Sequence, residues 1–150
     1  MMPKKDYAVF GIIEGVFGGI PLVIDKKEGF HSRQWEKWKL PGGSRDESEI
    51  SPAYTLMREI GEEIGIVMED SAKEVFRRNM GKHDFLVYAV RYYSGELKAG
   101  EEIKAVKIFS LPDVEKMIEE GKILKNHADA LSSYIGKRKS IEELIDAFVI

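Results

Sequence analysis

The sequence predicts a mixed α/β (α+β) fold in which helices cover a β-sheet. Short apolar runs bounded by glycine, proline and polar residues are typical of strands. Other segments place apolar residues at the three- and four-residue spacing of amphipathic helices, and the two kinds alternate along the chain. Because no repeat, low-complexity run or linker composition interrupts them, we expect residues 1–150 to form a single domain.

Composition narrows the class of protein. The chain has 150 residues, of which 43% are hydrophobic and 33% charged, as in globular proteins with a substantial core. A net charge of −3 gives no general attraction to nucleic acid or to an anionic membrane. The absence of cysteine excludes disulfides, thiolate metal sites and a cysteine nucleophile. A small-molecule partner and a cytoplasmic location are the expectation, and a monomer and a homodimer remain equally open.

The N-terminal apolar stretch is compatible with a targeting or membrane segment as well as with strands. Glu14, several glycines and Pro21 interrupt it, and no small-residue cleavage site follows. Two strands joined by a glycine-rich turn explain it better, and we expect a β-hairpin formed by Tyr7–Ile13 and Ile20–Asp25.

The remaining elements follow from the same patterns. The predicted strands are Trp38–Leu40, Glu74–Asn79, Phe85–Tyr93 and Ile103–Phe109. The predicted helices, besides the one described next, are Pro112–Glu119, Asn126–Ile135 and Ile141–Phe148. For the last of these, Ser140 and Glu143 have the spacing of a capping box.

The most informative helix is predicted over Pro52–Ile64. Ser51 is a favourable N-cap, proline suits the first helical position, and Gly65 is a plausible stop. One face is expected to be buried, formed by Ala53, Leu56, Met57, Ile60 and Ile64.

Three glutamates lie on the other side of this helix. At about 100° per residue, Glu59, Glu62 and Glu63 gather on the face opposite the apolar one. Like charges at this spacing destabilise a helix by roughly 0.2–0.5 kcal/mol per pair. A bound cation would relieve that repulsion, although such a pattern taken alone is also common on solvated surface helices.

A known family matches this stretch. Arg58–Ile66 reads REIGEEIGI and agrees with the second half of the Nudix box, R-E-U-x-E-E-x-G-U, at every specified position. Gly43 followed by five residues and Glu49 matches the first half, and WKLPGG resembles the segment that leads into the box. The chain therefore resembles the Nudix hydrolases of the MutT-like type. The resemblance implies an α/β/α sandwich with a mixed β-sheet.

One interval departs from the family pattern. The family has seven residues between the first glutamate and the arginine, whereas eight residues, 50–57, separate Glu49 from Arg58 here. We expect the extra residue in the loop before Pro52, because an insertion within the helix would rotate its face by about 100°.

The resemblance also implies a chemistry and a set of residues. The implied cofactor is Mg²⁺, with Mn²⁺ as a substitute, held by Glu59, Glu62, Glu63 and the carbonyl of Gly42. Glu59 is implied as a ligand or as the group that helps to deprotonate water. The other implied roles are catalytic for Arg58 and Glu62, structural for Gly43, Glu49 and Gly65, and a later-loop ligand or base for Glu101 or Glu102. An ordinary acidic turn also explains the last pair.

The implied reaction is hydrolysis of a phosphoanhydride bond in a nucleoside di- or triphosphate derivative. A small single-domain chain favours a MutT-like triphosphate substrate. An ADP-ribose substrate is disfavoured, because no proline lies between Ile66 and Pro112, where ADP-ribose-cleaving members often have one. The alternative is a Nudix-fold module that binds a nucleotide without cleaving it. The three histidines, His31, His83 and His127, are interpreted as structural or surface residues.

Overall fold

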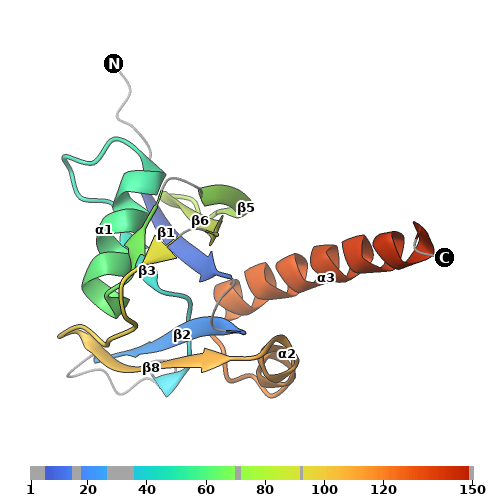
Figure 1. Cartoon of the computed structure of the whole chain (residues 1–150). Coiled ribbons are helices and arrows are strands. Elements are labelled where there is room, and N and C mark those ends of the chain that lie inside the picture. Colours follow the sequence, from blue (N-terminus) through green and yellow to red (C-terminus); the bar gives the residue numbers. More distant parts are fainter. Residues whose placement is uncertain (1–5, 15–17, 27–35, 70–71, 92, 149–150) are drawn as a thin grey trace.

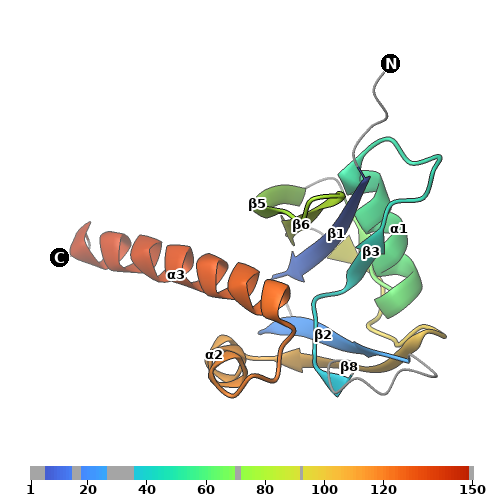
Figure 2. The same cartoon turned by 180° about the vertical axis from the view of Figure 1, so that it is seen from behind.

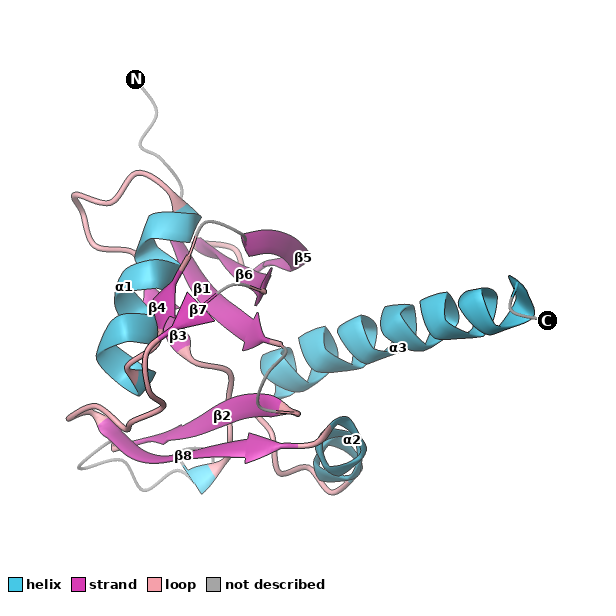
Figure 3. Cartoon of the chain, in the orientation of Figure 1, coloured by secondary structure: helices cyan, strands magenta, loops and turns pink. Residues whose placement is uncertain are grey.

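The computed structural model describes residues 6–14, 18–26, 36–69, 72–91 and 93–148. Eight strands and three helices lie in these ranges (Figures 1 and 3). The strands are β1 (Asp6–Ile13), β2 (Ile20–Asp25), β3 (Gly42–Ser44), β4 (Val67–Met68), β5 (Ala72–Asn79), β6 (His83–Val90), β7 (Tyr93–Ser94) and β8 (Ile103–Phe109). The helices are α1 (Pro52–Ile64), α2 (Leu111–Glu119) and α3 (Lys125–Phe148).

The central sheet has four strands in the order β3-β1-β6-β5. Strand β1 runs parallel to β6, and the other two pairings are antiparallel, so the sheet is mixed as predicted. Strands β2 and β8 form a separate antiparallel pair, as do β4 and β7.

Helices cover both faces of the central sheet, because the side chains of its strands alternate between two cores. On β1, Val9 and Ile13 join the core shared with α1. Phe10 and Ile12 join the core shared with α2 and α3. The sandwich and its mixed sheet are thus confirmed, and α1 lies on the opposite side from α2 and α3 (Figure 2).

Helix α1 has the predicted bounds and termini. The Ser51 hydroxyl accepts the Tyr54 N–H at 3.2 Å, and Gly65 ends the helix in the left-handed conformation with φ 74°. Leu56, Ile60 and Ile64 are fully buried as predicted. Met57 is a correction, because 42% of it is exposed, and Thr55 is buried in its neighbourhood instead.

The predicted N-terminal hairpin is wrong, although both of its strands exist. Both edges of β1 are occupied, by β3 and by β6, so β2 pairs with the distant strand β8. The predicted strand Trp38–Leu40 is reduced to isolated bridges, in which Lys39 pairs with Val23 and Trp38 with Ile123.

The two predicted C-terminal helices are one continuous helix, α3. Ser140 does not cap a new helix, because its hydroxyl donates to the carbonyl of Gly136 one turn earlier at 3.1 Å. The residues between the predicted helices, Gly136–Ser140, include good helix formers and no proline, so nothing breaks the hydrogen-bond ladder. Strand β6 ends at Val90, and β7 follows separately. Within the described ranges, no helix combines the length and apolarity that crossing a membrane requires.

Candidate active site

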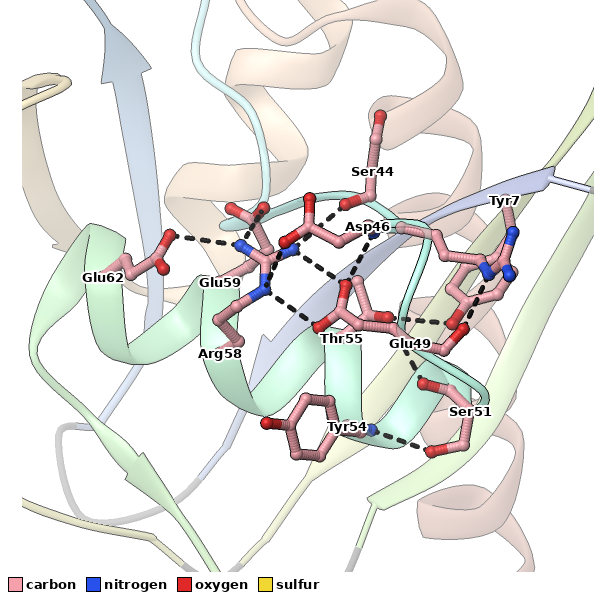
Figure 4. A network of polar contacts seen from close by, with 11 residues as sticks. Tyr7, Ser44, Asp46, Glu49, Ser51, Tyr54, Thr55, Arg58, Glu59 and Glu62 are labelled. Atoms are coloured by element: carbon pink, nitrogen blue, oxygen red, sulfur yellow. Dashed lines mark hydrogen bonds and ion pairs between the residues drawn. The ribbon is translucent and has the colours of Figure 1, made fainter.

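Helix α1 presents its polar side to strand β3 and to the loop between β3 and α1 (Figure 4). The segment Gly42–Ser44 is referred to below as the β3 turn. The buried residues Leu56, Ile60 and Ile64 fix the rotation of the helix against the sheet. That rotation sets the directions of Arg58 and of the glutamates that follow it.

Arg58 is bound to Glu49 by a bidentate ion pair. Its Nε donates to Oε2 at 2.9 Å and its Nη2 to Oε1 at 3.0 Å. The Glu49 side chain is only 3% exposed, and it also accepts the Asp46 backbone N–H at 2.7 Å. Hydrogen bonding to Arg58 lowers the pKa of Glu49 to about 2, against the opposing effect of burial. Arg58 is thus paired with a carboxylate of the motif, that of Glu49.

The same guanidinium reaches two glutamates of its own helix. Arg58 Nη1 lies 3.0 Å from Glu59 Oε1 and 3.2 Å from Glu62 Oε2. Its Nη2 also donates to the carbonyl of Ser44 at 3.2 Å, next to the glycines of β3. The Arg58 guanidinium thus connects the loop before α1, the β3 turn and the acidic face of α1.

Glu63 corrects the prediction of a fully exposed acidic face. Its side chain turns toward the sheet, where it is 9% exposed, whereas the Glu62 side chain is 62% exposed. Glu63 Oε1 accepts the backbone N–H of Gly42 at 2.7 Å. The three glutamates thus lie at different depths rather than on one solvated surface, because Gly43 and Gly42 of β3 lie against Glu59 and Glu63 while Glu62 points to solvent.

Burial changes the proton affinity of two of these groups. Desolvation raises the pKa of Glu63 to about 7, although Lys39 and the Gly42 N–H both favour the charged form. Desolvation also raises the pKa of Glu59, against the attraction of Arg58. A nearby cation would stabilise both carboxylates in their charged form.

The two glycines of β3 allow the close approach of α1. A Cβ on Gly43 would lie 2.6–2.8 Å from the carboxylate atoms of Glu59. Gly42 has φ +147°, and a Cβ there would lie 2.1 Å from the carbonyl oxygen of Val9. Gly43 therefore leaves the space that the Glu59 carboxylate occupies, and Gly42 gives the backbone path that brings its N–H to Glu63.

The donors at this site are those that a hard divalent cation prefers, namely carboxylate and carbonyl oxygens. Glu59 and Glu62 are held by Arg58, and Glu63 is held by Gly42. No three acidic or histidine side chains of the described ranges converge as a closed metal cluster. By the type and charge of their donors, these residues fit a hard divalent cation.

The loop that contains Glu101 and Glu102 follows a segment bound to the end of α1. Lys98 N–H donates to the carbonyl of Ile64 at 2.9 Å, and Gly100 N–H donates to that of Glu63 at 2.8 Å. Glu101 and Glu102 are exposed in the turn directly after Gly100. Their role as later-loop ligand or base stays a prediction.

Sequence reasoning missed two participants, Asp46 and Asp25, and the ion pair that Lys39 forms. Asp46 lies 3.5 Å from Arg58 and orients Glu49 through its N–H. Lys39 and Asp25 form an ion pair of 3.1 Å whose side chains are 14% and 17% exposed, and both act electrostatically on Glu63. Asp46 falls at an unspecified position of the motif, and the Lys39–Asp25 pair depends on strand pairing, so no sequence pattern identifies them.

The structure describes two of the three histidines interpreted as structural or surface residues. His127 is buried, accepts the Leu40 N–H at 3.1 Å and packs edge-on against Phe10, a structural role as predicted. His83 is exposed. His31 lies outside the described residues.

Comparison with known proteins decides the family. A model of the NUDIX domain matches residues 5–130, which is more than half of the chain. The chain belongs to the Nudix hydrolase family. This confirms the family that the motif indicated. Comparison with curated proteins gives no match.

Solved structures of Nudix proteins share the fold. The MutT NUDIX hydrolase from Burkholderia pseudomallei is 24% identical with a TM-score of 0.68, over 87% of this chain and 98% of that one. A NUDIX hydrolase from Nitrosomonas europaea is 18% identical with a TM-score of 0.73, over 93% and 75%. An ADP-ribose pyrophosphatase from Streptococcus suis is 24% identical with a TM-score of 0.63, over 87% and 89%. At these identities the likeness concerns the fold.

Proposed function

We propose that this Nudix hydrolase cleaves a phosphoanhydride bond in a nucleoside di- or triphosphate derivative and depends on Mg²⁺, with Mn²⁺ as a substitute. The observation that supports this best is the arrangement of Glu59, Glu62 and Glu63 beside the β3 turn. Arg58 contacts the first two of these glutamates and is itself bound to Glu49. We further propose that residues 1–150 act as one domain, in the cytoplasm.

In the proposed reaction, Glu59, Glu62, Glu63 and the Gly42 carbonyl would hold the metal ion. When bound, the ion would neutralise part of the phosphate charge and make a water molecule more acidic. Glu62 is exposed and accessible to a ligand. Glu59 is partly desolvated beside Gly43, and its raised pKa suits a group that accepts a proton from water. Arg58 positions Glu59 and Glu62 through Nη1 while its other nitrogens remain bound to Glu49.

A MutT-like nucleoside triphosphate is the proposed substrate class. The Burkholderia pseudomallei structure bears the MutT name, and the chain lacks a proline between Ile66 and Pro112. ADP-ribose is the second candidate, because the similar Streptococcus suis protein is an ADP-ribose pyrophosphatase.

The test is incubation of the protein with Mg²⁺ and a panel of nucleoside triphosphates, nucleotide sugars and dinucleotides, followed by chromatography of the products. We expect one substrate class to be cleaved, and removal of divalent ions to abolish the cleavage. Glu62→Gln should lower turnover at least 10²-fold, as expected when a group that stabilises the transition state is removed. Glu69→Gln, an exposed glutamate beyond the end of α1, is the matched control and should keep full turnover.

The same variants distinguish an enzyme from a binding module. Wild-type protein that binds a nucleotide, measured calorimetrically, but forms no product with any panel member would support the module. Full turnover by Glu62→Gln would overturn the assignment of the site. Mg²⁺ should also raise the thermal midpoint of wild type, by mass action on the native state, more than that of a Glu59/Glu62/Glu63→Gln variant.

A further inference from the structure

Lys39 is a largely buried lysine beside the candidate site. Its side chain is 14% exposed, and its Nζ lies 3.1 Å from Oδ2 of Asp25, whose side chain is 17% exposed. The Nζ also lies over the ring of Phe10, 5.4 Å from the ring centroid. An ion pair at this depth gains little net stability, because the desolvation of two charges offsets their attraction. Net stability therefore does not explain why a lysine occupies this position.

Backbone hydrogen bonds hold Lys39 close to the glutamates of the site. The Lys39 N–H donates to the carbonyl of Val23 in β2 at 3.0 Å, and the Val23 N–H donates to the Lys39 carbonyl at 2.9 Å. Three residues further along the chain, the Gly42 N–H donates to Glu63 at 2.7 Å. The positive charge of Lys39 favours the charged forms of both Glu63 and Glu59. Lys39 is thus within electrostatic reach of the place where the metal ion and a phosphate would bind.

Arg58, another cation of this site, has no donor left for a ligand. A guanidinium has five N–H donors. In Arg58 the Nε binds Glu49, the Nη1 binds Glu59 and Glu62, and the Nη2 binds Glu49 and the carbonyl of Ser44. These hydrogen bonds position the carboxylates and use the whole donor set of the side chain. A phosphate at this site therefore needs a different cationic side chain.

The ammonium of Lys39 still has donors for such a contact. An ammonium has three N–H donors. Among the described residues, Asp25 is its ion-pair partner and the Phe10 ring is its other charge contact. A lysine ammonium is a compact positive charge and a common ligand of phosphate groups. A nucleoside di- or triphosphate also has more negative charge than a single divalent ion neutralises.

We propose that Lys39 is a substrate-binding residue whose ammonium contacts a phosphate group of the substrate beside the proposed metal site. Asp25 compensates the charge of the ammonium until the substrate binds. This assignment rests on the proposed function, because it requires a phosphate-containing substrate at the glutamates of α1. The competing explanation is a purely structural ion pair that joins β2 to the segment before β3.

Binding of inorganic tripolyphosphate tests the assignment, because this probe has a phosphate chain without a base or a sugar. Calorimetric titration with excess Mg²⁺ measures its affinity. We expect Lys39→Met, which has a similar unbranched shape and no charge, to weaken binding by about tenfold or more, as for the loss of one charge-assisted contact. Lys39→Arg restores the charge and should recover most of the affinity. Lys122→Met is the matched control, because it removes an exposed lysine that is paired with Glu120 at 2.8 Å, and it should bind like wild type.

Asp25→Asn distinguishes a phosphate contact from a structural ion pair. If the pair only joined two segments, loss of either charge would weaken tripolyphosphate binding alike. Asp25→Asn leaves the ammonium in place and removes an anion near it, so we expect binding at least as tight as in wild type. Asp25→Asn/Lys39→Met leaves no unpaired charge and should show the same loss as Lys39→Met. Equal losses in the two single variants, or full affinity in folded Lys39→Met, would overturn the assignment.

Mn²⁺ binding, followed by electron paramagnetic resonance of the free ion, separates this assignment from the proposed function. Lys39→Met removes a positive charge near Glu59 and Glu63, so it should bind Mn²⁺ at least as tightly as wild type. A joint loss of Mn²⁺ and tripolyphosphate affinity in this variant would indicate a distorted site and overturn the role of Lys39. A wild type that binds no Mn²⁺ would overturn the proposed function and the assignment together. Wild-type Mn²⁺ binding with unchanged tripolyphosphate affinity in Lys39→Met would overturn the assignment alone.

Discussion

The guanidinium of Arg58 and the carboxylate of Glu49 face each other in a fork of two hydrogen bonds, 2.9 and 3.0 Å long. This ion pair binds the loop before α1 to the helix. Eight residues lie between Glu49 and Arg58 in the sequence, yet the two side chains are in contact. Ile50 and Ser51 belong to the loop, and a regular helix starts at Pro52. The position of the extra residue in the loop before Pro52 stays a prediction, with which the regular helix is compatible.

We expect Glu49→Ala to lower the free energy of unfolding by about 3 kcal/mol. Removing Glu49 deprives Arg58 of its buried bidentate partner. Arg58 is partly exposed and keeps weaker ion pairs with the other carboxylates of the site, which favours the lower end of the usual range. Urea denaturation at neutral pH measures the loss. Glu47→Ala, an exposed glutamate of the same loop, should change stability by less than about 0.5 kcal/mol.

The effect of Glu49 should also depend on pH. The pKa of Glu49 is lowered from 4.5 to about 2 in the folded state, so the unfolded state binds more protons between these values. The stabilisation is complete above pH 4.5 and is lost as the pH falls toward 2. The stability difference between wild type and Glu49→Ala should therefore shrink over that range, and a constant difference would contradict the role of the charged pair.

His127 should destabilise the fold at mildly acidic pH. Burial lowers its pKa from 6.5 to about 3, so the folded state keeps the ring neutral while the unfolded state binds a proton. Stability is then lost as the pH falls below 6.5, by roughly 2 kcal/mol at pH 5. His127→Asn, which retains an acceptor for the Leu40 N–H, should flatten the stability–pH curve between pH 5 and pH 6.5. A stability–pH curve that keeps its slope in His127→Asn would contradict the role of this buried ring.

Gly43→Ala should impair catalysis more than folding. The three atoms nearest to the new Cβ all belong to the flexible end of the Glu59 side chain, so we expect the carboxylate to move while the backbone stays. We expect a decrease in kcat of at least tenfold with a small change in thermal midpoint. Gly42→Ala provides the contrast, because its Cβ meets the Val9 carbonyl at 2.1 Å and should unfold or strongly destabilise the protein. Equal midpoints for the two variants would contradict this division.

Gly61→Ala should stabilise the enzyme without changing turnover. Gly61 lies within α1, its added Cβ would meet nothing closer than 3.9 Å, and the motif leaves this position unspecified. Alanine in place of glycine in a helix interior stabilises by about 0.5–1 kcal/mol. Calorimetry and steady-state kinetics of the variant measure both quantities, and a loss of activity would reveal an unrecognised approach to the substrate.

The sequence by itself determined the local elements and the family. Helix α1 has its predicted bounds, because capping residues and apolar spacing act within one segment. The box residues Arg58–Ile66 identified the Nudix family without any structure. Each of these features depends on residues that are close together in the sequence, so it can be predicted without the tertiary structure.

Only the tertiary structure decided which segments pair and how deep each glutamate lies. The sequence predicted a β1–β2 hairpin, yet β2 pairs with β8, because both edges of β1 are filled by strands distant in sequence. It placed Glu63 on an exposed face, yet the β3 turn covers it and supplies the Gly42 N–H. Helical periodicity predicts the direction in which a side chain points, but not which residues of other elements it contacts. The depth of Glu63, and the raised pKa that accompanies it, arise from that long-range contact.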